Sequence, residues 1–348
     1  MKILLVHPGA TWATADVWRG YRKALQRAGH EVIDYALAGR IVAAGGWLNY
    51  SWKKSGLPKE RKPTRNDILY AAGVFVLEKA LHHRVDWILV ISAMYLHPEA
   101  IVLLRRAGLR VAMIMTESPY DDEGQKRVAA LANCIFTNER TSVDAFREVC
   151  HSSHYLAHAY DPEVHQPHAV NGDTPAHDVV FVGTGFQERC EMLRAVDWDG
   201  IDLGLYGSWM LLGGRNQLRQ HLYGGVIDNR QAADMYQAAG IGLNIHRTST
   251  RWGRDAPRVN GAESVNPRVI ELAAGGVFCL SDWRAEMSDL FGYYVPRFST
   301  GEEMGELVHH YLGAPEERRE IAERMRQDVQ GQTFDVRATQ VVEALEAT

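Results

Sequence analysis

Two glutamates eight residues apart, Glu263 and Glu271, flank a predicted helix start. Asn266 is a favourable N-cap and Pro267 suits the first helical position, so we expect a helix that runs to Gly275. Glu263 then precedes the helix, while the carboxylate of Glu271 leans back toward the helix N-terminus, so both acids should converge on one pocket. The unpaired N–H groups of a helix start suit a diphosphate, and a carboxylate suits the hydroxyls of a ribose. Together these groups indicate a nucleotide.

The segment around these glutamates resembles a known family. The pattern E-x7-E, followed by a Gly-Gly turn and the apolar run VFCLS, is similar to the donor site of GT-B glycosyltransferases, the large retaining class especially. The runs DVVFVGTGFQERCEML, MYQAAGIGLNIHR and YYVPRFSTGEEMGELVHHYL resemble the CgeB-like, spore-maturation-type branch of that fold. The resemblance covers about half the chain and is most specific in the C-terminal half. It implies a nucleotide-sugar donor, either UDP- or GDP-linked, and transfer with retention of configuration.

Apolar strand-like runs alternate with helical stretches along the whole chain, which predicts an α/β protein with parallel sheets. We expect the GT-B arrangement, two Rossmann-like domains that face each other across a cleft. Residues 1–165 are the predicted acceptor-side domain and residues 179–330 the nucleotide-sugar domain. Residues 166–178, with two prolines and an Asn-Gly pair, are the predicted linker. Residues 331–348 form a C-terminal helix that is expected to pack back on the first domain.

Ligands in parallel α/β domains lie beyond the carboxyl ends of the strands, so the residues after each predicted strand are the site candidates. In the second domain, the candidates for donor binding follow the predicted strands or lie in the E-x7-E segment. They are Gly183, Thr184, Gly185, Arg189, Gly207, Asn244, His246, Ser264, Val265, Asn266, Arg268 and Glu271. The candidates after strands of the first domain are His7, Ser92, Thr116, Glu117 and Asn138.

Three candidates are given catalytic roles. Arg189 follows a Gly-rich turn, and its planar guanidinium suits a leaving diphosphate, although an exposed helix arginine is the alternative. Glu263 is expected to contact hydroxyls of the donor sugar, as the resemblance implies, or to be a solvated loop acid. Glu117 can position or deprotonate an acceptor hydroxyl, or else cap a helix. For Glu271 the alternative to ribose binding is an ion pair with Arg268 or Arg284.

Two patterns that can indicate a metal are discounted. Asp197-Trp198-Asp199 has D-x-D spacing but lies between a helix and a strand, ahead of a glycine, so we expect a turn. Six histidines between residues 151 and 177 form no closed set of zinc ligands. We therefore expect no bound metal.

Basic residues are concentrated in two segments. Residues 40–65 carry seven Lys or Arg against the single acid Glu60, interleaved with three aromatic residues. The second segment, RTSTRWGRDAPR, has four arginines. Such segments can bind phosphate backbones and stack on bases, so a polyanionic acceptor, including DNA or RNA, is one interpretation. The alternatives are an ordinary solvated loop, or arginines that serve the donor's own phosphates. The residues assigned here to the acceptor side are Trp52, Lys53, Lys54 and Arg251.

Composition sets further bounds. A chain of 348 residues is long enough for two cores, and its net charge of −5 gives no global attraction to nucleic acid or anionic lipid. The four cysteines show no C-x-x-C spacing, and the apolar start KILLVHPG is a strand and not a signal peptide, so we expect a cytoplasmic protein with free thiols and no membrane span.

Three other functions stay open at this point. A sugar-nucleotide epimerase of GT-B shape would use the same donor pocket without an acceptor. A nucleic-acid-binding protein without transferase activity would depend on the two basic segments. A catalytically inactive GT-B protein would keep the fold and lose the donor contacts. A nucleotide-sugar binding screen separates these alternatives.

Overall fold

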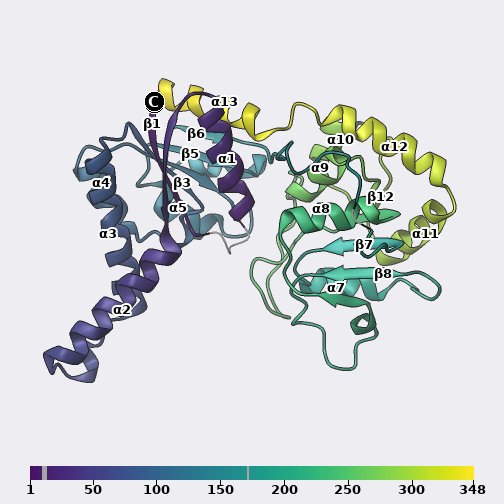
Figure 1. The fold of residues 1–348 in the computed structure, drawn as a ribbon, viewed down its shortest axis with the longest axis horizontal. Coiled ribbons are helices and arrows are strands. Elements are labelled where there is room, and N and C mark those ends of the chain that lie inside the picture. The colour runs from purple at the N-terminus through teal and green to yellow at the C-terminus, as the bar shows by residue number, and fades with distance from the viewer. Residues whose placement is uncertain (10–13, 171) are drawn as a thin grey trace. The chain divides into compact units, whose positions relative to one another are not determined.

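The computed structural model describes residues 1–9, 14–170 and 172–348, so Asn171 of the predicted linker lies outside the described residues. The chain divides into two compact units. Unit 1 contains Met1–Ala157 and Phe334–Thr348, and unit 2 contains His158–Thr333 (Figure 1). The described residues include no helix long and apolar enough to cross a membrane.

Unit 1 is built on a six-stranded parallel sheet of order β2-β1-β3-β4-β5-β6. Its strands are β1 (Lys2–His7), β2 (Glu31–Ala36), β3 (Trp87–Ile91), β4 (Val111–Met115), β5 (Cys134–Thr137) and β6 (Ser153–Tyr155). Its helices are α1 (Ala15–Arg27), α2 (Leu37–Ser55), α3 (Arg65–His83), α4 (Pro98–Arg106), α5 (Asp122–Ala129), α6 (Val143–Arg147) and α13 (Phe334–Ala347). Every residue of β3, β4 and β5 is buried, as expected for central strands covered by helices on both faces.

Unit 2 repeats this plan with a six-stranded parallel sheet of order β12-β11-β10-β7-β8-β9. Its strands are β7 (Val179–Val182), β8 (Leu203–Tyr206), β9 (Leu222–Gly224), β10 (Ile241–Asn244), β11 (Cys279–Asp282) and β12 (Arg297–Phe298). Its helices are α7 (Gln187–Arg194), α8 (Asn229–Ala238), α9 (Pro267–Ala274), α10 (Ala285–Phe291), α11 (Gly301–Leu312) and α12 (Pro315–Asp328). The predicted α/β class with two parallel sheets is therefore confirmed.

The division between the units differs from the predicted domain bounds. The chain passes from unit 1 to unit 2 after Ala157, whereas the predicted linker began at residue 166. Residues 158–170 are packed on unit 2, because Tyr160 forms a parallel bridge with Thr333 and the side chain of His165 is buried. His177 is also buried, with its ring nitrogens against Asp202 and Tyr206. A segment rich in proline and polar residues has no apolar period, so its packing could not be read from the sequence.

Helix α13 completes unit 1 from the far end of the chain. Gly20 of α1 lies against the ring of Phe334, where any Cβ would clash. Tyr21 packs edge to face on the same ring with centroids 5.3 Å apart. Arg27 Nε donates to Asp335 Oδ1 at 2.8 Å, and Arg337 Nε donates to the carbonyl of Ala157 at 3.0 Å. These contacts hold α13 on α1 and on the end of the first chain segment.

The largest departure from the expected connections lies at residues 37–55. The sequence favoured a basic connection between a strand and a helix, and the structure forms the 19-residue helix α2 there. Three glycines in this segment lower helix propensity, and its large apolar side chains do not follow one buried stripe, so the helical signal is weak.

Candidate functional site

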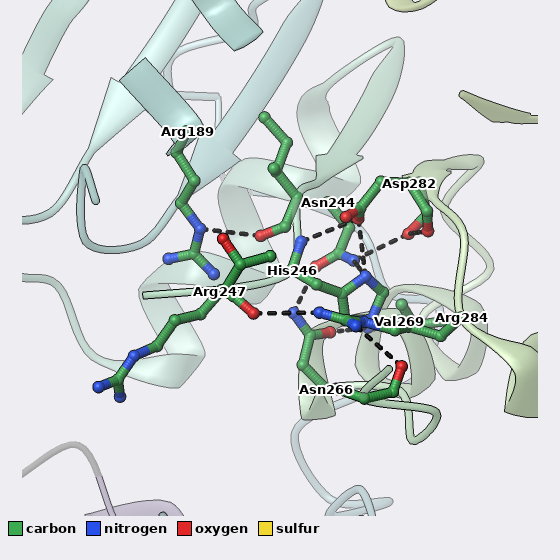
Figure 2. Close-up of polar contacts among 12 residues, drawn as sticks. Arg189, Asn244, His246, Arg247, Asn266, Val269, Asp282 and Arg284 are labelled. Carbon is green, nitrogen blue, oxygen red and sulfur yellow. Dashed lines mark hydrogen bonds and ion pairs between the residues drawn. The ribbon is translucent and has the colours of Figure 1, made fainter. Parts of the chain in front are cut away.

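The N-terminus of α9 is fixed to the carboxyl end of the unit 2 sheet by amide side chains (Figure 2). Asn266 is the N-cap, and its Oδ1 accepts from the N–H of Val269 at 3.3 Å, with Pro267 at the first helical position. The predicted helix start is therefore confirmed. Asn266 Nδ2 donates to Asn244 Oδ1 at 2.8 Å, and Asn244 Nδ2 donates to Ser281 Oγ at 2.9 Å. One chain of hydrogen bonds thus joins the helix start to β10 and β11.

His246, just beyond β10, is held by a carboxylate that the sequence reasoning missed. Asp282 Oδ1 accepts from the backbone N–H of His246 at 2.8 Å and lies 2.7 Å from its Nδ1 (Figure 2). Burial raises the pKa of Asp282, but the charge and hydrogen bonds of His246 outweigh this effect and lower its pKa, so Asp282 is ionised. Nδ1 therefore carries a proton, and the buried Nε2 has no hydrogen-bond partner among the described residues.

Arg189 lies inside unit 2 and not on its surface. Its Nε donates to the carbonyl of Ile245 at 2.8 Å, and its Nη1 donates to the carbonyl of Thr184 at 2.9 Å. The guanidinium also lies over the rings of Phe181 and Phe186, and only 9% of the residue is exposed. The structure thus excludes the exposed helix arginine and makes Arg189 a link between the loops after β7 and β10.

The Gly183-Thr184-Gly185 turn lies very close to the backbone of Gly207. Gly207, which follows β8, has φ of 111°, and a Cβ at this position would overlap the carbonyl oxygen of Gly183. Gly185 lies against the indole of Trp209. Glycine is therefore required at these positions for the loops after β7 and β8 to approach each other.

Two further carboxylates, also missed from the sequence, fix the loops around the site. Glu188 accepts from the N–H groups of Thr248 and Ser249 at 2.7 and 2.9 Å. Burial raises the pKa of Glu188, but these hydrogen bonds outweigh burial and lower the pKa. Glu286 accepts from the N–H of Val265 at 2.7 Å, and its own N–H donates to the carbonyl of Glu263 at 3.0 Å. The residues from 263 to 265 are therefore held at α10.

Arginines near this loop mostly serve the structure of unit 2. Arg284 donates to the carbonyls of Ala262 and Arg247 at 2.9 and 3.0 Å. Arg247 in turn lies over the ring of Phe186 and donates to the carbonyl of Thr250 at 2.8 Å, and Arg258 bonds to Glu191. Arg251 is exposed. Of the four arginines in the second basic segment, two are thus engaged within unit 2.

Glu271 lies in a buried ionic cluster. Its carboxylate is 2.8 Å from Arg268 Nη1, accepts from Asn229 Nδ2 at 3.2 Å, and is 3.9 Å from His165 Nε2. Burial raises the pKa of Glu271, but Arg268, His165 and Asn229 together lower it. The adjoining cavity has a volume of about 10 Å³, which is the room of one water molecule. The predicted ion pair with Arg268 is present, and Arg284 has other partners.

The carboxyl edge of the unit 1 sheet brings His7, Ser92, Thr116 and Glu117 to the ends of three adjacent strands. His7 is buried and stacked on Trp18 with centroids 4.1 Å apart, and burial, with Arg22 and Arg19, lowers its pKa to about 4. Ser92 has φ of 57°, a strained value for serine. The buried Thr116 hydroxyl has no hydrogen-bond partner in the described part of the chain.

Glu117 opens a tight turn. Its N–H donates to Gln125 Oε1 at 3.3 Å, and its carbonyl accepts from the N–H groups of Tyr120 and Asp121. Asn138 follows β5 along the same edge, and its Nδ2 lies 3.5 Å from the carbonyl of Ser118.

Asp197 and Asp199 form the predicted turn. The N–H of Asp199 donates to Asp197 Oδ1 at 3.1 Å, and Gly200 has φ of 74°. Trp198 between them is buried. The described residues contain no group of three or more His, Cys, Asp or Glu side chains arranged to hold a metal.

Trp52, Lys53 and Lys54 lie near the end of α2. Trp52 is half-buried and its Nε1 donates to the carbonyl of Pro58 at 3.1 Å, whereas both lysines are exposed. These residues belong to unit 1, and Arg251 belongs to unit 2.

Comparison with known proteins gives a family match for the second half of the chain. Residues 188–343 match a family model described as glycosyl transferase-like. This stretch contains Arg189, the E-x7-E segment and the loop after β10. No curated protein matches the chain in sequence.

Solved structures match the whole chain. Sucrose-phosphate synthase from Thermosynechococcus elongatus is 15% identical, with a TM-score of 0.67 over 99% of this chain and 98% of that chain. An α,α-trehalose-phosphate synthase (UDP-forming) from Burkholderia xenovorans, in complex with glucose-6-phosphate, is 10% identical, with a TM-score of 0.63 over 99% of both chains. A Listeria monocytogenes protein assigned as a UDP-N-acetylglucosamine 2-epimerase is 10% identical, with a TM-score of 0.60 over 99% of this chain and 96% of that chain.

These similarities establish the GT-B fold for the whole chain, as the sequence predicted. Residues 188–343, less than half of the chain, match a glycosyl transferase-like family model, which supports the predicted enzyme class.

Proposed function

We propose that this glycosyltransferase, on its GT-B fold, moves a sugar from a UDP- or GDP-linked donor to an acceptor hydroxyl with retention of configuration. We further assign it to the CgeB-like branch with an E-x7-E donor motif. The observation that carries the proposal is the α9 start, where Asn266 caps the helix and is tied through Asn244 to Ser281. A helix start held in this way offers fixed N–H donors to a diphosphate, with little reorganisation on binding.

In unit 2, the leaving diphosphate is proposed to lie between the α9 start and Arg189. Arg189 is already oriented by two backbone carbonyls, so its charge acts from a fixed position. The Nε2 atom of His246 is proposed to lie against an oxygen atom of the nucleotide sugar, since a ligand atom would give this buried nitrogen a hydrogen-bond partner.

The two glutamates have separate roles in this proposal. Glu263 contacts hydroxyls of the donor sugar, with the backbone of its loop held by Glu286. Glu271 binds the ribose, which requires the nucleoside to displace one of its present partners, because the adjoining cavity is only about 10 Å³. Donor binding is therefore expected to rearrange the Arg268–Glu271 pair.

Unit 1 is proposed to hold the acceptor at the carboxyl edge of its sheet. His7, Ser92 and Thr116 offer neutral hydrogen-bonding groups there, and Glu117 positions or deprotonates the reacting hydroxyl. We favour a saccharide or protein hydroxyl over a base hydroxyl of DNA or RNA. Arg247 and Arg258 are engaged within unit 2, so fewer arginines remain for a phosphate backbone than the sequence suggested.

The reaction is proposed to need no metal ion, because Arg189 and the α9 start supply fixed positive charge. A cytoplasmic location is part of the proposal. It is supported by the four cysteines, all of which are buried free thiols.

An epimerase remains the second candidate, because the same fold is present in the Listeria monocytogenes protein assigned as a 2-epimerase. The experiment is a panel of UDP- and GDP-sugars tested by thermal shift, followed by product analysis with and without a mixture of acceptors. Transfer predicts a glycoside with the anomeric configuration of the donor, seen by NMR. Conversion of the donor sugar without any acceptor would establish the epimerase instead, and no stabilisation by any nucleotide sugar would reject both.

A further inference from the structure

Helices α2 and α3 form a hairpin in unit 1 that extends away from the β-sheet (Figure 1). One side of α2 packs on α3, where Gly45 lies close to Ile68. The opposite side carries large apolar side chains in water. Val42 is 77% exposed, Trp47 66% and Tyr50 62%. An exposed apolar patch of this kind usually marks an interaction site.

The apolar side chains share this face with positive charge. At 100° per residue, a single arc of α2 presents Arg40, Val42, Trp47, Tyr50, Lys53 and Lys54, which we call the α2 face. Helix α2 contains no acidic residue. Lys54 Nζ lies 5.9 Å from the ring centroid of Tyr50, so the basic and aromatic groups are adjacent.

The turn after α2 continues the same character. Trp52 Nε1 donates to the carbonyl of Pro58, and Ser55 Oγ donates to the carbonyl of Trp52 at 2.8 Å, so the turn is held in one shape. Leu57, at the tip of this turn, is 50% exposed. The basic residues that follow Leu57 are exposed as well, namely Lys59, Arg61 and Lys62.

We propose that the α2 face and this turn dock the protein on the surface of an anionic phospholipid bilayer. Tryptophan and tyrosine favour the headgroup region, where the ring is buried and its polar tip stays hydrated, and lysine and arginine pair with anionic headgroups. The exposed aliphatic residues Val42 and Leu57 gain from the acyl boundary, whereas a nucleic-acid backbone offers them no apolar surface. The whole protein carries a net charge of −5, so attraction to an anionic surface must come from a local patch such as this one.

The experiment is co-sedimentation of the full-length protein with vesicles of phosphatidylglycerol and phosphatidylcholine, and with vesicles of phosphatidylcholine alone. The test variants are Trp47→Ser/Tyr50→Ser and Lys53→Glu/Lys54→Glu. The control, Arg106→Glu/Arg127→Glu, makes the same charge change at exposed positions on α4 and α5. We expect all three variants to fold, because every substituted side chain is exposed, and circular dichroism and thermal melts check this.

The proposal predicts binding to the anionic vesicles, weakening with salt, and little binding to phosphatidylcholine. Each test variant should bind at least about tenfold more weakly, while the control stays within about twofold of the wild type. Equal loss in the control and the test variants would overturn the proposal, as would no binding at low salt. Single-stranded DNA binding that depends on Lys53 and Lys54, without vesicle binding, would overturn it in favour of nucleic acid. A dimer in sedimentation velocity that Trp47→Ser/Tyr50→Ser abolishes, again without vesicle binding, would assign the face to a second copy.

Discussion

The two units have the same kind of sheet, but the carboxyl edges of the sheets are built from different chemistry. At the edge of unit 2, Glu188, Glu271, Asp282 and Glu286 are all paired with arginine, histidine or backbone N–H groups. At the edge of unit 1, His7 is held neutral, and Thr116 has a buried hydroxyl with no partner among the described residues.

This difference indicates how each edge meets its ligand. Paired charges fix the loops of unit 2 before a ligand arrives, which suits the recognition of a charged diphosphate by preorganised donors. The neutral groups of His7, Ser92 and Thr116 at the edge of unit 1 suit hydrogen bonds to a neutral hydroxyl, which Glu117 at the same edge is proposed to position or deprotonate. Four measurements test this difference between the units.

The largest effect is expected at Glu271. Glu271→Ala leaves Arg268 half-buried without its carboxylate, so we expect the free energy of unfolding to fall by about 3–5 kcal/mol, measured by urea titration. Stabilisation by UDP or GDP in a thermal shift should also disappear.

The double variant Glu271→Met/Arg268→Met separates these two effects, since it removes both charges at once. We expect it to be more stable than Glu271→Ala and still unresponsive to nucleotide. A double variant that binds nucleotide normally would leave Glu271 with a structural role alone.

At Arg189 the contrast concerns catalysis. Arg189→Ala removes a positive charge aimed at the leaving diphosphate, so kcat should fall by about a hundredfold or more, with a smaller change in KM. Arg189→Lys keeps the charge and loses the planar fork, and should retain part of the turnover.

Stability must be measured on the same Arg189 variants, because this side chain also links the loops after β7 and β10. Near-normal turnover with a lowered Tm would show that Arg189 links these two loops and has no role in catalysis.

The pH response should differ between the units. The pKa of His7 is about 4 in the folded protein, below its ordinary value of 6.5, so the unfolded state binds more protons between these two values. Stability therefore falls as the pH drops from 6.5 toward 4, by about 2 kcal/mol between pH 7 and pH 5. The lowered pKa values of Asp282 and Glu271 act in the same direction but at lower pH, since their stabilisation is lost only below about pH 4.

Urea titrations of the wild type and of His7→Gln at both pH values measure the His7 contribution. The variant should lose about 2 kcal/mol less than the wild type between pH 7 and pH 5. Identical pH dependence in the two proteins would contradict a buried neutral His7.

The smallest effect is expected from metal removal. If fixed protein charge serves the diphosphate, then EDTA should leave the transfer rate within about twofold of its starting value. A rate lost in EDTA and restored by Mn²⁺ would overturn metal independence, and would show that the charges of unit 2 do not suffice.

Local sequence signals predicted the fold and the start of α9, because these depend on neighbouring residues. Asn266 followed by Pro267 is a cap signal within two positions, and the apolar runs of β3 and β4 identify central strands. The candidate residues after the strands followed from one rule about parallel sheets.

The missed residues depend on partners that are far away in the chain. Asp282 is 36 residues from His246, and Glu188 is 61 residues from Ser249, so no local pattern joins them. Each acid resembles an ordinary surface acid in the sequence. Their positions were the one available signal. Glu188 adjoins the candidate Arg189, and Asp282 ends β11, next to the strand that ends in the candidate Asn244.

The return of α13 to unit 1 has a consequence for the order in which the chain is made. Residues 158–333 separate the first segment of unit 1 from α13, and at about 5–20 residues per second a ribosome needs roughly 10–35 s to add them. During that interval Gly20 and Tyr21 lack the ring of Phe334 that covers them in the finished structure. Unit 2, which is continuous in sequence, can complete its fold while this surface of α1 is still open to water.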